Sequence, residues 1–199
     1  MRLTRGPAPA APTLEAGARR LAVVGCSGSG KTTLAQELAR RLDAEHIELD
    51  AINNLAGWRD RARVETRAIV TERVRASRWV VDGNYDWLAA DIWPLADVVI
   101  ILDPPLRTVL RRVVVRTVAR VVLRRTLWNG NRETWSNVFS RDPRRSIIRW
   151  AWRRHPEYRR KYRALLDAGS EVRLLHLTSA SAVRRFLRTV SARSMSEKG

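Results

Sequence analysis

A glycine-rich run near the N-terminus carries the residue types that bind phosphate. The run Gly25-Cys26-Ser27-Gly28-Ser29-Gly30-Lys31-Thr32 fits the pattern G-x-x-x-x-G-K-[ST] without a mismatch. Its glycines let backbone N–H groups close on an anion, because no Cβ intervenes and a positive φ costs glycine little. Lys31 can reach the β- and γ-phosphates of a nucleotide, and the Thr32 hydroxyl can ligate Mg²⁺. We therefore expect these eight residues, with Thr33 directly after them, to bind a nucleotide.

The residues on either side of this run favour a phosphate-binding loop over a chance glycine turn. Residues 21–24 form a short apolar stretch that is typical of a buried strand. After the run, Leu34, Leu38 and Leu42 recur at helical spacing. A strand, a glycine loop and a helix in this order place the free N–H groups and partial positive charge of the helix N-terminus beside the loop.

The remaining chain alternates between predicted strands and helices. Further strands are expected at 46–50, 79–85, 96–103 and 171–177, and helices at 33–42, 63–76, 106–128, 146–166 with a break near Pro156, and 180–190. Alternation of this kind predicts an α/β fold with a five-stranded parallel sheet and right-handed crossovers.

Three acids follow predicted strands, and they are expected to meet the glycine loop at one edge of the sheet. Asp82 precedes Gly83 and could hold Mg²⁺ or cap a turn. Asp50 could orient a hydroxyl or accept its proton, or it could cap a helix. Asp103 precedes two prolines and is assigned a structural role.

Arginine dominates the second half of the chain. Between Arg107 and Arg163 there are 17 arginines, against three acids. Arg112, Arg116, Arg120 and Arg124 recur every four residues, which puts them on one broad helical face. Most arginines of this region are expected to form a solvated face or to dock a polyanion.

Composition limits the class of protein. The net charge of +18 should attract phosphates, nucleic acid or acidic lipids. Cys26 is the sole cysteine, which excludes an intrachain disulfide and a cysteine-based metal site. No apolar run is long enough to span a membrane, so a cytoplasmic protein is expected. We expect a disordered leader over 1–18, one domain over 19–190 and a disordered tail over 191–199, and the sequence leaves the oligomeric state unknown.

These residues resemble the P-loop kinases related to adenylate kinase, and more closely the bacterial DNA topology modulation (FlaR-like) proteins. The likeness covers roughly residues 20–188. Its more particular pieces are Trp79-Val80-Val81-Asp82-Gly83-Asn84-Tyr85 and Trp150-Ala151-Trp152, whose indoles are expected to pack. The resemblance implies a three-layer P-loop NTPase fold of the nucleoside monophosphate kinase type.

The resemblance also implies an activity, an ATP-dependent transfer of the γ-phosphoryl group to a nucleotide or other small-molecule acceptor. Thr32 and, through water, Asp82 would hold Mg²⁺, while Asp50 and Trp58 would face the acceptor. A lid at about 107–160 would bring Arg112 and Arg116 to the transferring phosphoryl group, with Arg159 or Arg160 as a further candidate. Asn84-Tyr85 replaces the Phe-Pro-Arg of adenylate kinase, so the acceptor-binding arginine of that motif is missing.

Two other functions stay open at this stage. The arginine helix at 107–125 could lie along a nucleic-acid backbone, with ATP acting only as a switch. The same valine- and arginine-rich helix could instead rest on a membrane surface.

Overall fold

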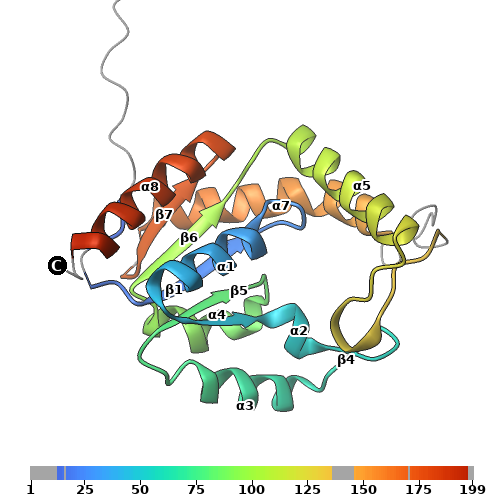
Figure 1. The fold of residues 1–199 in the computed structure, drawn as a ribbon, viewed down its shortest axis with the longest axis horizontal. Helices are drawn as coiled ribbons and strands as arrows, with labels where there is room; N and C mark the ends of the chain where they lie inside the picture. Colours follow the sequence, from blue (N-terminus) through green and yellow to red (C-terminus); the bar gives the residue numbers. More distant parts are fainter. Residues whose placement is uncertain (1–12, 16, 136–145, 170, 197–199) are drawn as a thin grey trace, which may run out of the picture.

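The computed structural model describes residues 13–15, 17–135, 146–169 and 171–196, so most of the expected leader lies outside the described residues. Five parallel strands form the central sheet in the order β2-β5-β1-β6-β7 (Figure 1). The strands are β1 (Arg20–Gly25), β2 (Glu45–Glu48), β5 (Trp79–Asp82), β6 (Val98–Leu102) and β7 (Arg173–Leu177). The predicted five-stranded parallel sheet is confirmed.

The central strands are mostly apolar because both faces of the sheet are covered. Successive residues of β1 enter different halves of the core: Leu21 and Val23 join one buried cluster, and Ala22 and Val24 join the other. This alternation follows from the period of two along a strand. Continuous apolar runs are therefore what the sequence shows at β1 and β6.

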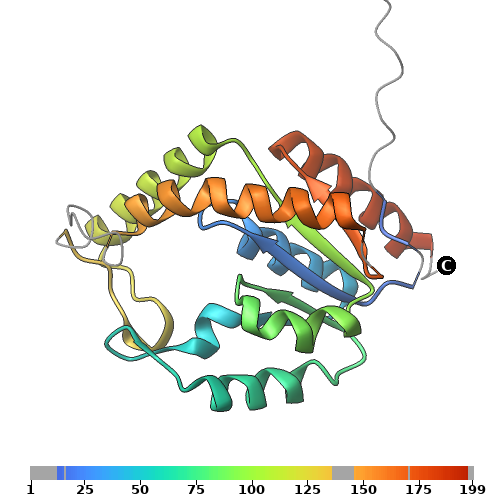
Figure 2. The ribbon, with the colours of Figure 1, turned by 180° about the vertical axis from the view of Figure 1, so that it is seen from behind.

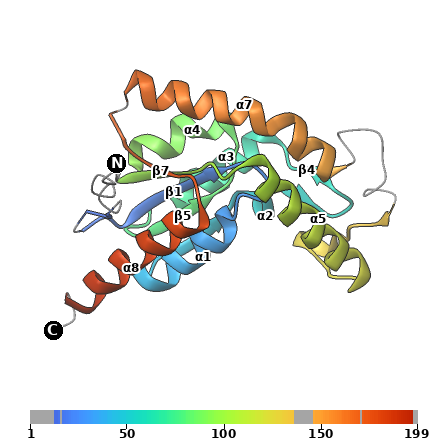
Figure 3. The ribbon, with the colours of Figure 1, turned by 90° about the horizontal axis from the view of Figure 1, so that it is seen from above.

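Helices form the two outer layers of the molecule. The first cluster includes side chains of α1 (Lys31–Leu42) and α8 (Ala180–Ser196), and the second includes side chains of α3 (Arg63–Arg73), α4 (Asp86–Ile92) and α7 (Ile147–Ala168). Seen from above, α4 and α7 lie on one side of the sheet, and α1 and α8 lie on the other (Figure 3). The three-layer architecture agrees with the expectation.

A peripheral ring of segments extends from one end of the sheet. Helix α5 (Leu106–Val122) leads to the short turn η2 (Trp128–Gly130). This turn lies beside α2 (Leu49–Asn53) and the small hairpin β3 (Asn54–Leu55) and β4 (Arg59–Asp60). Figures 1 and 2 show the chain after α5 curving back to that hairpin.

Several predicted boundaries are wrong. The strand expected to reach Asp50 ends at Glu48, and Asp50 lies in the first turn of α2. The helix expected over 106–128 ends at Val122, and Arg124 follows with a left-handed φ of 46°. Helix α7 continues through Pro156 without the expected break.

The ends of the domain also differ from the expectation. Leu14 and Ala18 are buried in the core cluster that α1 and α8 cover, so ordered structure begins before residue 19. Helix α8 continues to Ser196 rather than ending at Val190. None of the helices in the described part of the chain is long and apolar enough to cross a membrane.

Candidate functional site

The glycine loop joins β1 to α1 and packs directly against α5. Gly28 has a φ of 81°, and a Cβ there would lie 2.5 Å from Cγ2 of Val113 and 2.9 Å from the carbonyl oxygen of Val109. Gly30, with a φ of 99°, precedes the first residue of α1. Glycine is therefore needed at these positions both for the backbone conformation and for the contact with α5.

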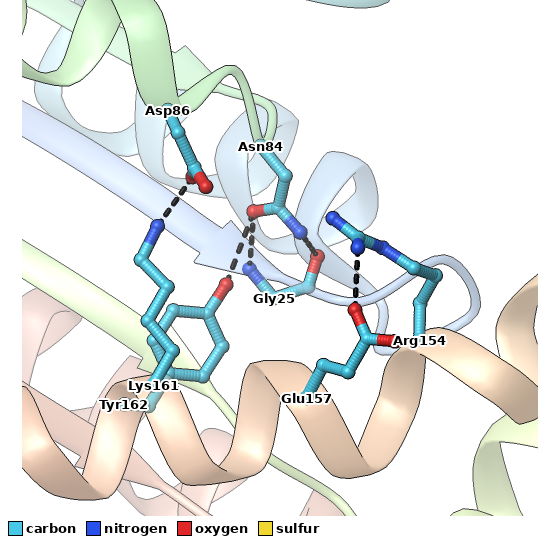
Figure 4. A network of polar contacts seen from close by, with 7 residues as sticks. All are labelled: Gly25, Asn84, Asp86, Arg154, Glu157, Lys161 and Tyr162. Atoms are coloured by element: carbon cyan, nitrogen blue, oxygen red, sulfur yellow. Dashed lines mark hydrogen bonds and ion pairs between the residues drawn. The ribbon is translucent and has the colours of Figure 1, made fainter.

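Asn84 fixes the start of the loop. Its side-chain Oδ1 accepts a hydrogen bond from the Gly25 amide at 3.0 Å, and its Nδ2 donates to the Gly25 carbonyl at 2.5 Å (Figure 4). Tyr162 of α7 donates to the same Oδ1 at 3.2 Å. The sequence singled out Asn84 only as part of a motif, and the structure gives it this positioning role.

One ion pair connects α7 to α4 beside this network, and a second lies within α7. Lys161 pairs with Asp86, which opens α4, and within α7 Arg154 pairs with Glu157 (Figure 4). The first of these pairs links the two helices on the same side of the sheet as Asn84.

Thr32 and Asp82 meet where a metal ion is expected. The Thr32 hydroxyl lies 2.6 Å from Oδ2 of Asp82, whose side chain is almost fully buried. Nε2 of His46 lies 2.7 Å from the other carboxylate oxygen, a contact that the sequence did not suggest. The hydroxyl and the carboxylate are oxygen donors of the type that Mg²⁺ prefers, so the residues fit a magnesium ion beside a bound phosphate.

The two arginines expected to reach the phosphates both point to the glycine loop. Arg112 donates through NH1 to the Ser29 carbonyl at 2.8 Å, and Arg116 donates through NH2 to Oγ of Ser27 at 3.1 Å. Burial lowers the pKa of Arg116, and Nε of this side chain is buried with no hydrogen-bond partner among the described residues. An anion in the loop would supply that partner.

A groove of about 980 Å³ opens beside the loop, between α1, α5 and the start of α8. Lys31 lines it, as do Arg112 and Arg116. Oγ of Ser29 is buried near its wall and has no hydrogen-bond partner within the described part of the chain. A cradle of glycine amides, a lysine and an unsatisfied hydroxyl is the donor set that a nucleotide phosphate requires.

Asp50 and two aromatic residues form the other side of the site. Tyr85 donates from its hydroxyl to Oδ1 of Asp50 at 2.9 Å, and burial raises the pKa of Tyr85 above its usual range, which keeps the donor protonated. Trp58 is 41% exposed and has a φ of 56°. Its amide donates to Oδ1 of Asn131 at 2.9 Å, so it packs against the chain after α5.

Glu48, at the end of β2, is a site residue that the sequence analysis missed. Burial raises its pKa, and a hydrogen bond from Trp128 acts in the opposite direction. The neighbouring carboxylates of Asp82 and Asp50 also raise this pKa. Its strand reads Glu45-His46-Ile47-Glu48, in which Glu48 carried no sequence signal beyond its nearness to Asp50.

Other candidates lie outside the site. Asp103 is buried, and its Oδ2 lies 3.4 Å from Nε of Arg159 and 3.4 Å from Nε2 of His176. Arg160 is exposed. Trp150 packs in the core as expected, whereas Trp152 is 61% exposed, contrary to the expectation.

Solved structures share this fold. A gluconokinase from Sinorhizobium meliloti 1021 has a TM-score of 0.51 and 16% sequence identity, with 91% of this chain and 94% of the gluconokinase covered. A shikimate kinase from Acinetobacter baumannii in complex with shikimate has a TM-score of 0.48 and 19% identity, with 91% and 95% covered. Curated proteins gave no match to the chain.

A family model described as an AAA domain matches residues 21–186. The matched range includes the glycine loop, the acids at the strand ends, and Arg112 and Arg116 of α5. The chain therefore belongs to this AAA domain family of P-loop proteins.

Proposed function

We propose that the protein is an ATP-dependent phosphotransferase whose acceptor is a small molecule. The observation that carries this proposal is the hydrogen bond at 3.1 Å from the guanidinium of Arg116 to Oγ of Ser27 in the glycine loop. Burial lowers the pKa of this arginine, and the carboxylate of Asp50 acts in the opposite direction. A positive charge between a phosphate cradle and an acceptor-facing carboxylate is what transfer of a phosphoryl group requires.

Each half of the site has a separate task. The glycine loop and Lys31 bind the phosphates of ATP, while Arg112 and Arg116 stabilise the charge on the group that moves. Tyr85 holds Asp50 so that its second carboxylate oxygen can accept the proton of an acceptor hydroxyl. Mg²⁺ bound by Thr32 and Asp82 would neutralise charge on the β- and γ-phosphates.

The proposal includes the closer kinship with adenylate kinase-related and topology modulation proteins. It is supported by the Asp82-Gly83-Asn84-Tyr85 motif, in which Asp82, Asn84 and Tyr85 each contact the site.

Replacing Lys31 by alanine tests the proposed function. We expect Lys31→Ala to abolish turnover of labelled ATP while the circular dichroism spectrum stays unchanged, because the side chain lines the groove and not the core. Lys161→Ala is the matched control, since Lys161 pairs with Asp86 at the surface of α7 and α4. Normal turnover in Lys31→Ala, or equal loss in both variants, would contradict the proposal.

A further inference from the structure

Helix α5 presents apolar side chains to the solvent along its outer side. Val114, Val118 and Val122 recur every four residues, so they lie on one line along the helix. Val114 is 39% exposed, Val118 is partly exposed and Val122 is 61% exposed. Leu123, which directly follows the helix, is 60% exposed. These four residues form the apolar face of α5, and exposed apolar side chains that are grouped in this way mark interaction sites.

The apolar face is turned away from both the core and the glycine loop. The buried residues of α5 form one stripe: Val109, Val113, Thr117 and Val121. Each valine of the apolar face comes one residue after a member of this stripe, which rotates it by about 100° around the helix. Arg112 and Arg116 lie about 100° from the stripe in the opposite direction, where they donate to the glycine loop. A partner can therefore meet the apolar face without displacing these two arginines.

Four exposed arginines lie at the two ends of the apolar face. Arg107 and Arg111 come two turns and one turn before its first valine, on the same side of the helix. Arg124 and Arg125 directly follow the leucine at the other end. The four guanidinium groups form no hydrogen bond or ion pair within the described residues, and the chain has no acidic residue from 104 to 132. Their charge is therefore available to a partner.

This combination of aliphatic and guanidinium groups restricts the class of partner. A nucleic-acid backbone would pair with the arginines but would leave the valines and the leucine in water. A second copy of the chain, packed through the same surface, would bring arginines of like charge together. An anionic lipid bilayer satisfies both kinds of group, because its phosphates pair with guanidinium groups while apolar side chains enter the boundary between headgroups and acyl chains.

The place of α5 in the fold also suits a flat partner. Figures 1 and 3 show the helix at the edge of the molecule. The convex surface of a single helix can rest on a bilayer. A stable protein–protein interface buries about 800 Å² on each partner, which is more than these four apolar side chains expose. A membrane surface is therefore the partner that the observations favour over an acidic protein.

We propose that the outer side of α5 docks on a membrane surface that contains anionic lipid. The arginines at the two ends of the apolar face pair with lipid phosphates, and the side chains of Val118 and Val122 enter among the headgroups. This docking surface goes beyond the proposed phosphotransferase activity and does not depend on it. The docked helix still contacts the glycine loop through Arg112 and Arg116, which lie on its other side.

Flotation of the full chain with lipid vesicles tests the proposal. One set of vesicles contains phosphatidylcholine alone, and the other contains phosphatidylcholine with about one third phosphatidylglycerol. At about 0.15 M salt, we expect the anionic vesicles to bind the protein at least about tenfold more tightly than the neutral vesicles. This preference should decrease as the salt concentration is raised, because salt screens the exposed arginines.

Replacing two valines tests the apolar half of the surface. Val114→Ser together with Val122→Ser should weaken binding to the anionic vesicles by about fivefold or more, because the apolar contact with lipid is lost. Serine and valine have similar helix propensities, so α5 should persist in the circular dichroism spectrum. The matched control is Val64→Ser on α3, since Val64 is 81% exposed and lies on another helix. The control should bind as the unaltered protein does.

Replacing three arginines tests the charged half. Arg107→Gln, Arg124→Gln and Arg125→Gln together should weaken binding by about fivefold for each arginine removed. Arg111 is left in place because it also lines the groove beside the glycine loop. A control with the same net charge replaces three other exposed arginines by glutamine: Arg19, Arg185 and Arg188. The control should lose much less affinity, since its arginines lie away from α5.

Each outcome supports or overturns the docking surface. Tighter binding to anionic vesicles that depends on both the valines and the arginines of α5, with both controls retained, supports it. Absence of binding, or equal binding to neutral and anionic vesicles, overturns it. Equal losses in the α5 variants and their controls would indicate only general attraction of a basic protein. Dependence on the arginines with no effect of the valines would indicate an acidic protein or another polyanion, and it would also overturn the proposal.

Discussion

At the scale of single residues, the site contains polar side chains that each form hydrogen bonds with two partners. Asp82 receives Thr32 and His46 on its two carboxylate oxygens, and Asn84 holds both the amide and the carbonyl of Gly25. A buried polar group with partners on both sides has one favourable position. The geometry of these polar residues is therefore defined before any ligand binds.

Cys26 is expected to be unreactive although it lies in the glycine loop. Its side chain is 3% exposed, and burial raises the pKa of its thiol to about 11 against the opposing effect of Lys31. Because the thiolate is the reactive form, a thiol reagent at pH 8 should label the folded protein at least about a hundredfold more slowly than the unfolded protein. Rapid labelling of the folded protein would show that the loop opens.

The same thiol gives stability a pH dependence. A group whose pKa is raised in the folded state contributes stability below its unfolded pKa and loses that contribution as pH rises toward its folded pKa. Urea unfolding should therefore show stability falling between about pH 8.5 and 11, by up to about 3 kcal/mol. Cys26→Ser should lack this part of the decline, and an identical decline in both proteins would rule out Cys26 as its source.

At the scale of elements, the contact between the glycine loop and α5 is the feature that other P-loop arrangements need not share. Gly28→Ala would place its Cβ against Val113 and the Val109 carbonyl, in addition to the strain of a positive φ. We expect a loss of about 2–5 kcal/mol in the free energy of unfolding, together with weaker ATP binding.

Gly57→Ala is the control for this substitution. Gly57 has a φ of 74°, close to that of Gly28, but a Cβ there would meet no atom within 4 Å. The free energy of unfolding of Gly57→Ala should fall only by the backbone strain of about 1–2 kcal/mol, and ATP binding should stay unchanged. An equal loss of unfolding free energy in Gly28→Ala and Gly57→Ala would mean that α5 does not pack closely against the glycine loop.

The elements that the sequence predicted well are those with long, regular patterns. Strands β1 and β6 were predicted from their apolar runs, which burial on both faces of the sheet requires. Helix α1 was predicted from its leucine spacing, which burial of one helical face requires. Helices α2 and α4 and the β3–β4 hairpin were missed, since five to seven residues are too few to show a helical period and a two-residue strand shows no alternation.

The candidate site divides in the same way. The glycine loop and Lys31 followed from local spacing, whereas the role of Arg112 and Arg116 was implied by the family resemblance. The structure places both arginines against the glycine loop. Glu48 and Asn131 could not be found from sequence, because their roles depend on contacts between segments about eighty residues apart.

At the scale of the whole molecule, the net charge of +18 is less available to a polyanion than the sequence suggested. Of the four arginines on the predicted helical face, Arg124 lies beyond the end of α5. The other three are engaged within the protein: Arg112 and Arg116 at the glycine loop and Arg120 with Glu133. The structure therefore offers no support at this helix for the nucleic-acid-binding alternative.

Two asparagines of the segment after α5 bind the β3–β4 hairpin region at one end of the site. Asn131 is buried, accepts from the Trp58 amide and donates to the Leu55 carbonyl, with both distances 2.9 Å. Asn129 donates to the Asn54 carbonyl at 2.5 Å. These contacts join the chain that leaves α5 to the hairpin that follows α2, so segments far apart in the sequence lie side by side near Trp58 (Figure 1).

Removing the buried asparagine should loosen this junction without disturbing the glycine loop. Asn131→Ala leaves the Leu55 carbonyl and the Trp58 amide without partners, and we expect a loss of about 1–3 kcal/mol in urea unfolding. Acceptor affinity should fall while affinity for the ATP analogue stays the same, because the lost contacts lie on the acceptor side. Asn129→Ala is the control: its side chain is exposed, so water can replace the bond and the loss should stay below about 1 kcal/mol. If Asn131→Ala weakened nucleotide binding as much as acceptor binding, the two halves of the site would be one cooperative unit, and the junction would not act on the acceptor alone.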